Sequence, residues 1–457
     1  MTEIKPKSTL TFYGGVGTVT GANFLLTTPQ SKILVDCGMF QGQKMCDDKN
    51  SAPFPYDVST IDALIVTHAH MDHIGRIPKL VKDGFKGKIY STLQTKELAE
   101  VMLPDAAHIL GEEAKKCGMP PAYLPEDVTP VFNQWETIPY YTNRAIGDVG
   151  IYFKDAGHVL GSAFVECTHE SFGKLVFSGD LGNSPSPILR DTDMITDANY
   201  LLIESVYGDR LHEPVHDRRA ILENIIESTI AKRGTLLIPA FSLERTQAVL
   251  FDINVLVEER RIPRIPVFLD APLAIKVTDV YRRSTDLFNK ETQEIISGGD
   301  DIFSFEGLKL VTTQDASRSI HATGGPKIII AGSGMSHGGR IIGHEQHYLS
   351  DAASTILIVG YQSPGSLGRE LQEGAGSVVI HGEKIPVRAR IETLNAYSGH
   401  RDLHGLLEFV STSSLTLKKV FVAMGEPKSA QFLTQRMRDF LGIDATAPNP
   451  GDVITLG

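Results

Sequence analysis

Four side chains that can bind a metal ion stand close together in residues 66–75, which read VTHAHMDHIG. They are His68, His70, Asp72 and His73, in a chain that has only 15 histidines among 457 residues. Three imidazoles and a carboxylate in one short segment are costly to bury, and the imidazoles repel one another once protonated. The spacing therefore predicts a metal site and disfavours a solvated loop that is histidine-rich by chance.

Further candidate ligands stand elsewhere in the chain: Asp36, His158 and Asp180 where predicted strands end, and His400 beyond the inserted part, while Glu204 repeats the strand-end pattern. Polar residues placed where strands run into loops are typical of active sites built on a rigid sheet. One tetrahedral zinc ion needs fewer ligands than this set offers, so the set predicts two metals. A carboxylate can bridge two ions at about 3.5–4 Å, where they polarise a phosphoryl or carbonyl oxygen and acidify a water.

The elements that must position these ligands are short strands and turns in the N-terminal part. The glycine-rich stretch GGVGTVTG at residues 14–21 leads into another strand, so it predicts a hairpin turn. A dinucleotide-binding unit would need a helix at that point. Helices are expected from about Asp72 to Gly84 and from about Gln94 to Lys116, where capping residues flank the apolar periodicity.

From about Leu211 onward the chain alternates strictly between predicted helices and strands. This pattern indicates a parallel sheet covered by helices. The last part then offers one more set of strands and helices. We therefore expect an α/β protein in which a second α/β domain, residues 209–386, is inserted into a first domain made of residues 1–208 and 387–457.

Composition limits the classes of function. The formal net charge of −11 does not suit a simple DNA-coating protein, although a local cationic groove on an acidic body can still hold phosphates. The four cysteines form no CxxC pair, which argues against a cysteine zinc ribbon. No apolar run approaches the roughly 18 residues that span a membrane, and the N-terminus lacks a signal-peptide core, so a cytoplasmic location and no membrane partner are expected.

The segment THAHMDH resembles the HxHxDH signature of the metallo-β-lactamase fold. The resemblance implies an αββα sandwich and two metal ions with a shared carboxylate. It assigns His68, His70 and His158 to the first ion, Asp72, His73 and His400 to the second, Asp180 as the bridge, and Asp36 as the residue that orients the signature loop. Flavodiiron members carry Glu where this chain has His70, so two Zn²⁺ ions are favoured over iron.

Four further segments, IESVYGDR, IPAFSLERTQ, AGSGMSHGGR and NAYSGHRD, resemble in order the motifs of the β-CASP nucleases. This branch includes the cleavage and polyadenylation endonuclease and its bacterial and archaeal relatives. The resemblance implies catalytic roles for Asp36, Asp180, Glu204 and His400, with the Glu204 carboxylate bonded to the His400 ring. A histidine at position 400 is usual in RNA-processing members. The chain departs from the family where the endonuclease has a leaving-group histidine, because Glu370 stands there.

The segment GSGMSHGGR follows the predicted strand KIIIAG and opens a predicted helix. Backbone amides at a helix N-terminus can face an anion, and an arginine adds a bidentate donor. Ser333, Gly334, Met335 and Arg340 are therefore candidate phosphate-binding residues, and Arg245 is a possible further contact. A solvated helix residue is an equally good interpretation of Arg245.

The leading hypothesis is a zinc-dependent ribonuclease that hydrolyses phosphodiester bonds of single-stranded RNA, with endonuclease action preferred to exonuclease action. The alternative is a hydrolase of the same fold that acts on an ester, thioester or lactam. The large insertion argues against it, because a small acyl substrate needs no such lid. A non-catalytic RNA-binding subunit is disfavoured because every ligand position is filled. The sequence is also compatible with a homodimer.

Overall fold

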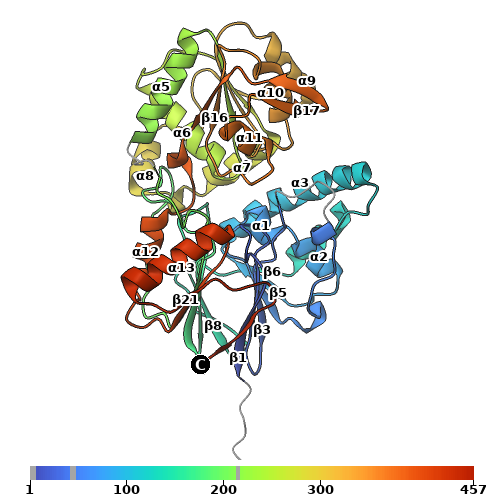
Figure 1. Cartoon of the computed structure of the whole chain (residues 1–457), viewed down its shortest axis with the longest axis vertical. Coiled ribbons are helices and arrows are strands. Elements are labelled where there is room, and N and C mark those ends of the chain that lie inside the picture. The colour runs from blue at the N-terminus through green and yellow to red at the C-terminus, as the bar shows by residue number, and fades with distance from the viewer. Residues whose placement is uncertain (1–6, 42–47, 213–216) are drawn as a thin grey trace, which may run out of the picture. The chain divides into compact units, whose positions relative to one another are not determined.

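The structure is a computed structural model that describes residues 7–41, 48–212 and 217–457. The chain forms two compact units (Figure 1). We call Met1–Leu211 with His400–Gly457 the sandwich unit, and His212–Gly399 the inserted unit. None of the helices in the described ranges is long and apolar enough to cross a membrane.

The sandwich unit contains two seven-stranded sheets. In order across the first sheet, the strands are β22 (Val453–Leu456), β1 (Ser8–Gly14), β2 (Asn23–Thr27), β3 (Lys32–Val35), β4 (Ala63–Ile65), β5 (Lys88–Ser91) and β6 (Trp135–Thr137). The second sheet contains β21 (Ala445–Thr446), β20 (Lys419–Val422), β11 (Tyr200–Ile203), β10 (Gly173–Phe177), β9 (Ala163–His169), β8 (Val149–Asp155) and β7 (Arg144–Ile146).

Helices lie outside both sheets. Figure 1 shows α2 (Ile77–Lys82) and α3 (Leu93–Cys117) beside the first sheet, and α12 (Leu403–Ser411) and α13 (Pro427–Leu441) beside the second. Short helices α1 (Met71–Ile74) and α4 (Thr129–Asn133) complete the first layer. The order helix, sheet, sheet, helix confirms the predicted αββα sandwich.

The core between the sheets comes from side chains that alternate along the strands. In β8 every second residue is buried, the pattern of a strand with one face in the core. Phenylalanines meet across the layer: the Phe12 and Phe421 ring centroids, on β1 and β20, lie 5.4 Å apart. Burial of this apolar surface holds the two sheets together, so the loops at their edges rest on a rigid support.

Two local predictions are confirmed and one is corrected. The stretch at residues 14–21 joins the antiparallel strands β1 and β2 as a turn, and α3 spans the predicted second helix, with Thr92 as its N-cap. The helix expected from Asp72 to Gly84 is instead two helices, α1 and α2. Arg76 leaves the helical region at φ −105°, and Pro78 has no N–H to continue the ladder from the preceding turn.

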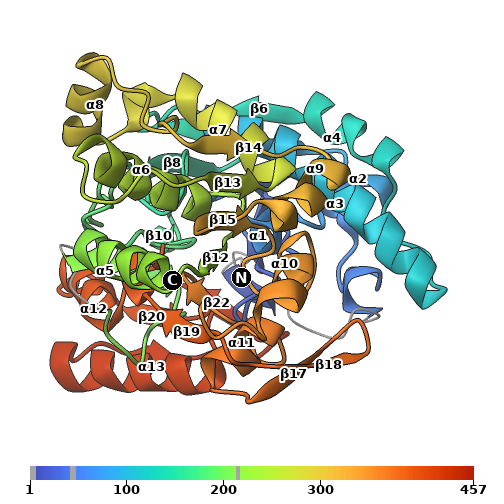
Figure 2. The ribbon, with the colours of Figure 1, turned by 90° about the horizontal axis from the view of Figure 1, so that it is seen from above.

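The inserted unit is built on a six-stranded, all-parallel sheet, which confirms the predicted alternation. The strands in order are β14 (Leu308–Leu310), β13 (Val267–Asp270), β15 (Lys327–Ala331), β12 (Thr235–Pro239), β16 (Thr355–Ile358) and β19 (Arg390–Thr393), with a separate hairpin of β17 (Ser377–Ile380) and β18 (Glu383–Pro386). The helices are α5 (Arg218–Ala231), α6 (Arg245–Glu258), α7 (Pro272–Arg283), α8 (Lys290–Ser297), α9 (Gln314–Ser319), α10 (Ile341–Tyr348) and α11 (Leu367–Gln372). Figure 2 shows α5 and α6 on one side of this sheet and α10 and α11 on the other.

The chain returns to the sandwich unit later than the predicted residue 387. Strand β19 pairs in parallel with β16, so it extends the inserted sheet, and the two units divide between Gly399 and His400. The first division lies between Leu211 and His212, close to the predicted 208 and 209.

Candidate metal centre

The signature loop between β4 and α1 is fixed by the carboxylate of Asp36, which follows β3. Its Oδ1 accepts the backbone N–H of Thr67 at 2.8 Å, and its Oδ2 accepts the Thr67 hydroxyl at 2.9 Å and lies 2.7 Å from His73 Nδ1. The loop backbones also meet closely, since a Cβ on Gly38 would lie 1.5 Å from the Asp72 carbonyl oxygen. Asp36 thus holds the loop as the family resemblance implies.

These contacts determine which ring nitrogens can bind an ion. A hydroxyl has one proton, and Thr67 gives it to Asp36, so the Thr67 oxygen accepts from His68 Nδ1 at 3.0 Å. His68 Nε2 therefore carries its lone pair. His73 Nδ1 donates to Asp36, which leaves His73 Nε2 buried without a hydrogen-bond partner in the described part of the chain. Thr67 was missed in the sequence analysis, although it directly precedes the signature.

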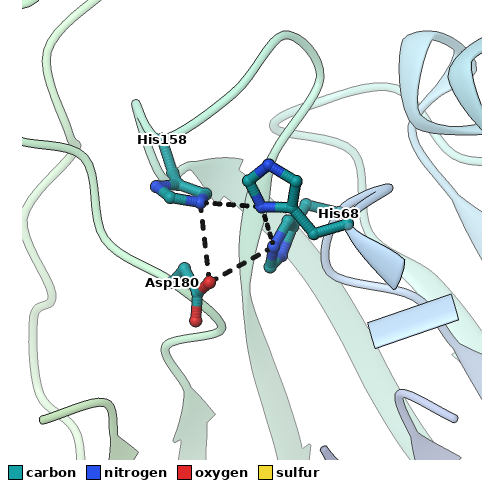
Figure 3. Close-up of side chains that lie close together, drawn as sticks. His68, His158 and Asp180 are labelled. Atoms are coloured by element: carbon teal, nitrogen blue, oxygen red, sulfur yellow. Dashed lines mark hydrogen bonds and ion pairs between the residues drawn. The ribbon is translucent and has the colours of Figure 1, made fainter. Parts of the chain in front are cut away.

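The imidazoles of His68 and His158 face the carboxylate of Asp180, and a third imidazole contacts both of these rings (Figure 3). His70 Nδ1 lies 3.2 Å from His68 Nε2 and 3.1 Å from His158 Nε2. Asp180 Oδ2 lies 3.4 Å from His68 Nε2 and 3.5 Å from His158 Nε2. One ligand atom from each of these four residues falls within 4.8 Å of all the others. Three imidazole nitrogens and a carboxylate oxygen form a donor set that suits zinc.

A second group shares the same carboxylate and consists of Asp180, Glu204 and His400. His400 Nδ1 lies 3.2 Å from Glu204 Oε2 and 3.9 Å from Asp180 Oδ2. The second oxygen of Glu204 accepts the backbone N–H of Leu181 at 2.6 Å. Glu204 is fully buried, so it can fix the orientation of the His400 ring. The other ring nitrogen, His400 Nε2, then points away from Glu204.

The other two residues assigned to the second ion lie next to this group. His73 Nε2 is 3.4 Å from Asp180 Oδ1, while Asp72 stands half-buried on α1. Neither residue belongs to the two groups found among the described residues. The structure therefore brings together His68, His70, His158, Asp180, Glu204 and His400, with His73 at the edge and Asp72 on the adjoining turn.

The electrostatics keep these side chains in the protonation states that bind metals. Burial lowers the pKa of His68, His70 and His158, and neighbouring imidazoles lower it further. Burial acts to raise the pKa of Asp180, but His73, His68 and His400 outweigh it and lower that pKa well below its usual value. Neutral imidazoles around an ionised carboxylate are the ligand forms that a divalent cation requires.

His73 differs from the other imidazoles. Burial acts to lower its pKa, yet the carboxylates of Asp180 and Asp36 outweigh burial and raise that pKa well above its usual value. The two carboxylates thus attract positive charge to a buried nitrogen without a hydrogen-bond partner among the described residues. A cation beside Asp180 would supply that charge, so the residues present fit a metal ion.

Comparison with known proteins accounts for this arrangement. Residues 16–220 match the model of the metallo-beta-lactamase superfamily, residues 246–371 the Beta-Casp domain, and residues 384–448 the Zn-dependent metallo-hydrolase RNA specificity domain. Ribonuclease TTHA0252 of Thermus thermophilus is 38% identical over 398 residues, which cover 87% of this chain and 89% of that protein. The chain belongs to the β-CASP branch of the metallo-β-lactamase superfamily.

Other relatives of this β-CASP protein come from archaea. The transcription termination factor FttA of Cenarchaeum symbiosum is 31% identical over 98% of this chain and 70% of its own length. The factor of the same name from Methanosarcina mazei is 29% identical over 96% of this chain. A solved structure of a protein of unknown function from Enterococcus faecalis covers 99% of the chain with a TM-score of 0.54 and 12% identity, which supports the fold alone.

The candidate phosphate-binding residues lie in the inserted unit of the β-CASP protein, at the ends of its parallel strands. Arg340 is engaged inside the unit: it donates to the buried carboxylate of Asp270 and to the carbonyls of Val311 and Thr312, the latter two at 3.0 and 2.6 Å. His344 Nε2 lies 2.8 Å from the other Asp270 oxygen. Asp270 was missed from the sequence, although it ends a predicted strand as the metal ligands do.

Arg245 and Ser333 have more capacity for an outside ligand. Arg245 pairs with Glu244 at 2.9 Å, but its Nε is buried without a hydrogen-bond partner in the described residues, and so is the Ser333 hydroxyl. Gly334 lies against the Phe241 ring, where a Cβ would come within 2.7 Å, and Met335 is buried. These residues line the carboxyl ends of β12 and β15, where ligands of parallel sheets commonly bind.

Proposed function

We propose that this β-CASP protein is a zinc-dependent ribonuclease that hydrolyses phosphodiester bonds of single-stranded RNA, with endonuclease action preferred. The observation that carries the proposal is the Asp180 carboxylate, which shares a ligand group with His68, His70 and His158 and also lies 3.4 Å from His73 Nε2 and 3.9 Å from His400 Nδ1. Imidazoles of two sets gathered around one shared carboxylate suit a two-metal hydrolase. The names of the relatives, a ribonuclease among them, support RNA as the substrate.

The residues would hold two ions as follows: His68, His70, His158 and Asp180 around one, and Asp180, His400, His73 and Asp72 around the other. Bound there, the ions would supply Lewis acidity, which acidifies a water and stabilises negative charge on a scissile phosphate. Zinc is favoured because the set is dominated by imidazole nitrogens.

The chain's own residues prepare this chemistry. Asp36 and Thr67 set the tautomers of His73 and His68, so that their Nε2 atoms face Asp180. Glu204 bonds His400 Nδ1 and so orients that ring. Such partners orient the ligand rings and raise their basicity. His68, His73, His158, Asp180 and Glu204 are buried, which limits the contact of these groups with bulk water.

RNA binding is assigned to the inserted unit. The buried Arg245 Nε and Ser333 hydroxyl are donors available to a phosphate oxygen, and the amides of Gly334 and Met335 lie in the same loop. Arg340 acts mainly by holding this loop through Asp270. Charge-assisted bonds from arginine to phosphate position the strand without reading its sequence.

The test is cleavage by zinc-loaded protein of an unstructured RNA labelled at both ends, with matched DNA, a thioester and a β-lactam as competing substrates. We expect zinc-dependent cleavage of RNA at internal positions. Blocking the 5′ end distinguishes the two modes, since an endonuclease still cuts and a 5′-exonuclease does not. Turnover of the thioester or lactam with intact RNA would contradict the proposal.

A further inference from the structure

A row of two phenylalanines and an arginine runs along α13, in which Phe440 is exposed and Phe432 and Arg436 are half-buried. Arg436 lies between the rings: its guanidinium carbon is 4.6 Å from the Phe432 centroid and 5.4 Å from the Phe440 centroid. Residues four apart on a helix share one face, so the three side chains form a row, and Phe440 at its end is 67% exposed. The adjoining face of α13, with Leu433 and Met437, is buried against the second sheet. The row is therefore not part of the core.

The guanidinium in this row has unused hydrogen-bonding capacity. No carboxylate lies within 4.0 Å of Arg436 in the described part of the chain, and no hydrogen bond to it is found there. Stacking between rings occupies the faces of a guanidinium and leaves its N–H groups free in the plane. The helix also carries Lys428 and Arg438 but only one acid, Asp439, in a chain of net charge −11. The row is a basic, aromatic strip on an acidic protein.

The start of α13 is bonded to the chain directly after Glu204. The Ser429 hydroxyl donates to the backbone carbonyl of Ser205, which directly follows Glu204. From Phe432 to Phe440 the helix rises about 12 Å, at 1.5 Å per residue. Phe432, the first residue of the row, thus lies within one helical turn of Ser429, which is bonded to the residue after Glu204. The rest of the row lies farther along the helix.

We infer that the Phe432–Arg436–Phe440 row is a binding site for single-stranded RNA outside the metal centre, an inference that rests on the proposed function. Bases stack on exposed aromatic rings whatever their sequence, and a guanidinium held in a plane binds a phosphate through two N–H groups. The stretch that matches the RNA specificity domain, residues 384–448, contains the row. A second copy of the chain fits less well, since two rings among polar neighbours are too small for a stable dimer core.

The experiment compares two substrates of the zinc-loaded protein: a short oligoribonucleotide, and the same oligoribonucleotide extended by an unstructured tail. The measured quantity is the ratio of kcat/KM for the long substrate to that for the short one. The variants are Phe432→Ala/Phe440→Ala, Phe440→Ala alone and Arg436→Lys, which keeps the charge but loses the planar group. Lys428→Ala is the matched control, because it removes a charge from the same helix but outside the row.

We expect the double variant to lower the ratio by about 5- to 100-fold, as for the loss of a base–aromatic stack. Arg436→Lys should lower it by a few-fold and Lys428→Ala should leave it at the wild-type value. A wild-type ratio in both aromatic variants would overturn the inference. So would a change from dimer to monomer with an unchanged ratio, which would assign the row to contact between copies.

If the wild-type protein cleaves neither RNA, the proposed function fails, and the row is tested separately by fluorescence anisotropy. The tail alone should then bind the wild-type protein more tightly than the double variant. Equal binding of the tail to both proteins would overturn the inference independently of catalysis.

Discussion

The metal centre of the sandwich unit and the Asp270 cluster of the inserted unit both gather charged residues at strand ends, yet their contacts differ in kind. In the metal centre like groups face one another, since His70 Nδ1 lies near two other ring nitrogens and a neutral imidazole has one N–H to give. In the cluster, Arg340 and His344 both donate to Asp270. A network of paired charges stabilises its own unit. A cluster in which ring nitrogens with lone pairs face one another has the capacity to bind a metal ion.

The largest expected effect comes from Asp180→Asn. The amide keeps the shape but loses the charge that both ligand groups share, so hydrolysis of RNA should fall below detection while the circular dichroism stays that of the wild type. Zinc content and turnover are measured on the same preparation. Wild-type turnover with two bound zinc ions would refute Asp180 as the bridge.

Asp270→Asn is the matched change in the other region, and it should affect stability instead of chemistry. The substitution removes the negative charge that pairs with the mostly buried Arg340 guanidinium. The loss in the free energy of unfolding is about 3 kcal/mol, the lower end of the range for breaking a buried ion pair. The free energy of unfolding in urea should fall by this amount with zinc content unchanged. An unaltered unfolding curve would show that the cluster is not a paired network of this kind.

Glu204→Gln should give a partial defect. Loss of a partner that orients a metal ligand typically costs about 10–100-fold in metal affinity or activity, and the amide can still accept one hydrogen bond. Activity titrated against zinc should recover in part as zinc is raised. Full activity at limiting zinc would remove the role assigned to the contact with His400.

Glu345 lies on α10 and accepts a hydrogen bond from Ser336 in the loop that follows β15, and it gives the stability of the inserted unit a pH dependence of its own. Burial raises the pKa of Glu345 to about 8 from the usual value of 4.5. Between these pH values the folded state keeps a proton that the unfolded state releases, so stability falls as pH rises, by up to about 1.4 kcal/mol per unit. Glu345→Gln should flatten this slope in urea unfolding, and the exposed Glu370→Gln should not. Equal slopes in all three proteins would contradict the assignment.

The smallest expected effect is on the salt dependence of RNA binding, and it should differ between Arg245 and Arg340. Arg245→Ala should make the slope of log K for RNA against log salt shallower by about 0.7, the value for one phosphate contact to a single strand. Arg340→Ala should move the slope less and lower the stability of the unit instead, because its guanidinium is already bonded to Asp270. The reverse pattern would make Arg340 the phosphate contact.

Much of this architecture is predictable from the sequence, because its signals are local. The spacing of His68, His70 and His73 and the polar residues after apolar strands are read within a few positions. What could not be predicted depends on partners distant in sequence. Strand β19 reads as a strand in isolation, but only its pairing with β16 assigns it to the inserted sheet. Arg340 in the segment GSGMSHGGR suggests a phosphate site, and only the fold brings Asp270 beside this arginine.

We propose above that two metal ions share the carboxylate of Asp180. The most direct test is anomalous diffraction at the zinc edge from crystals grown with zinc. We expect two anomalous peaks about 3.5–4 Å apart that both contact Asp180, the first also contacting His68, His70 and His158 and the second also contacting His400. A single peak, or two peaks of which only one contacts Asp180, would contradict it.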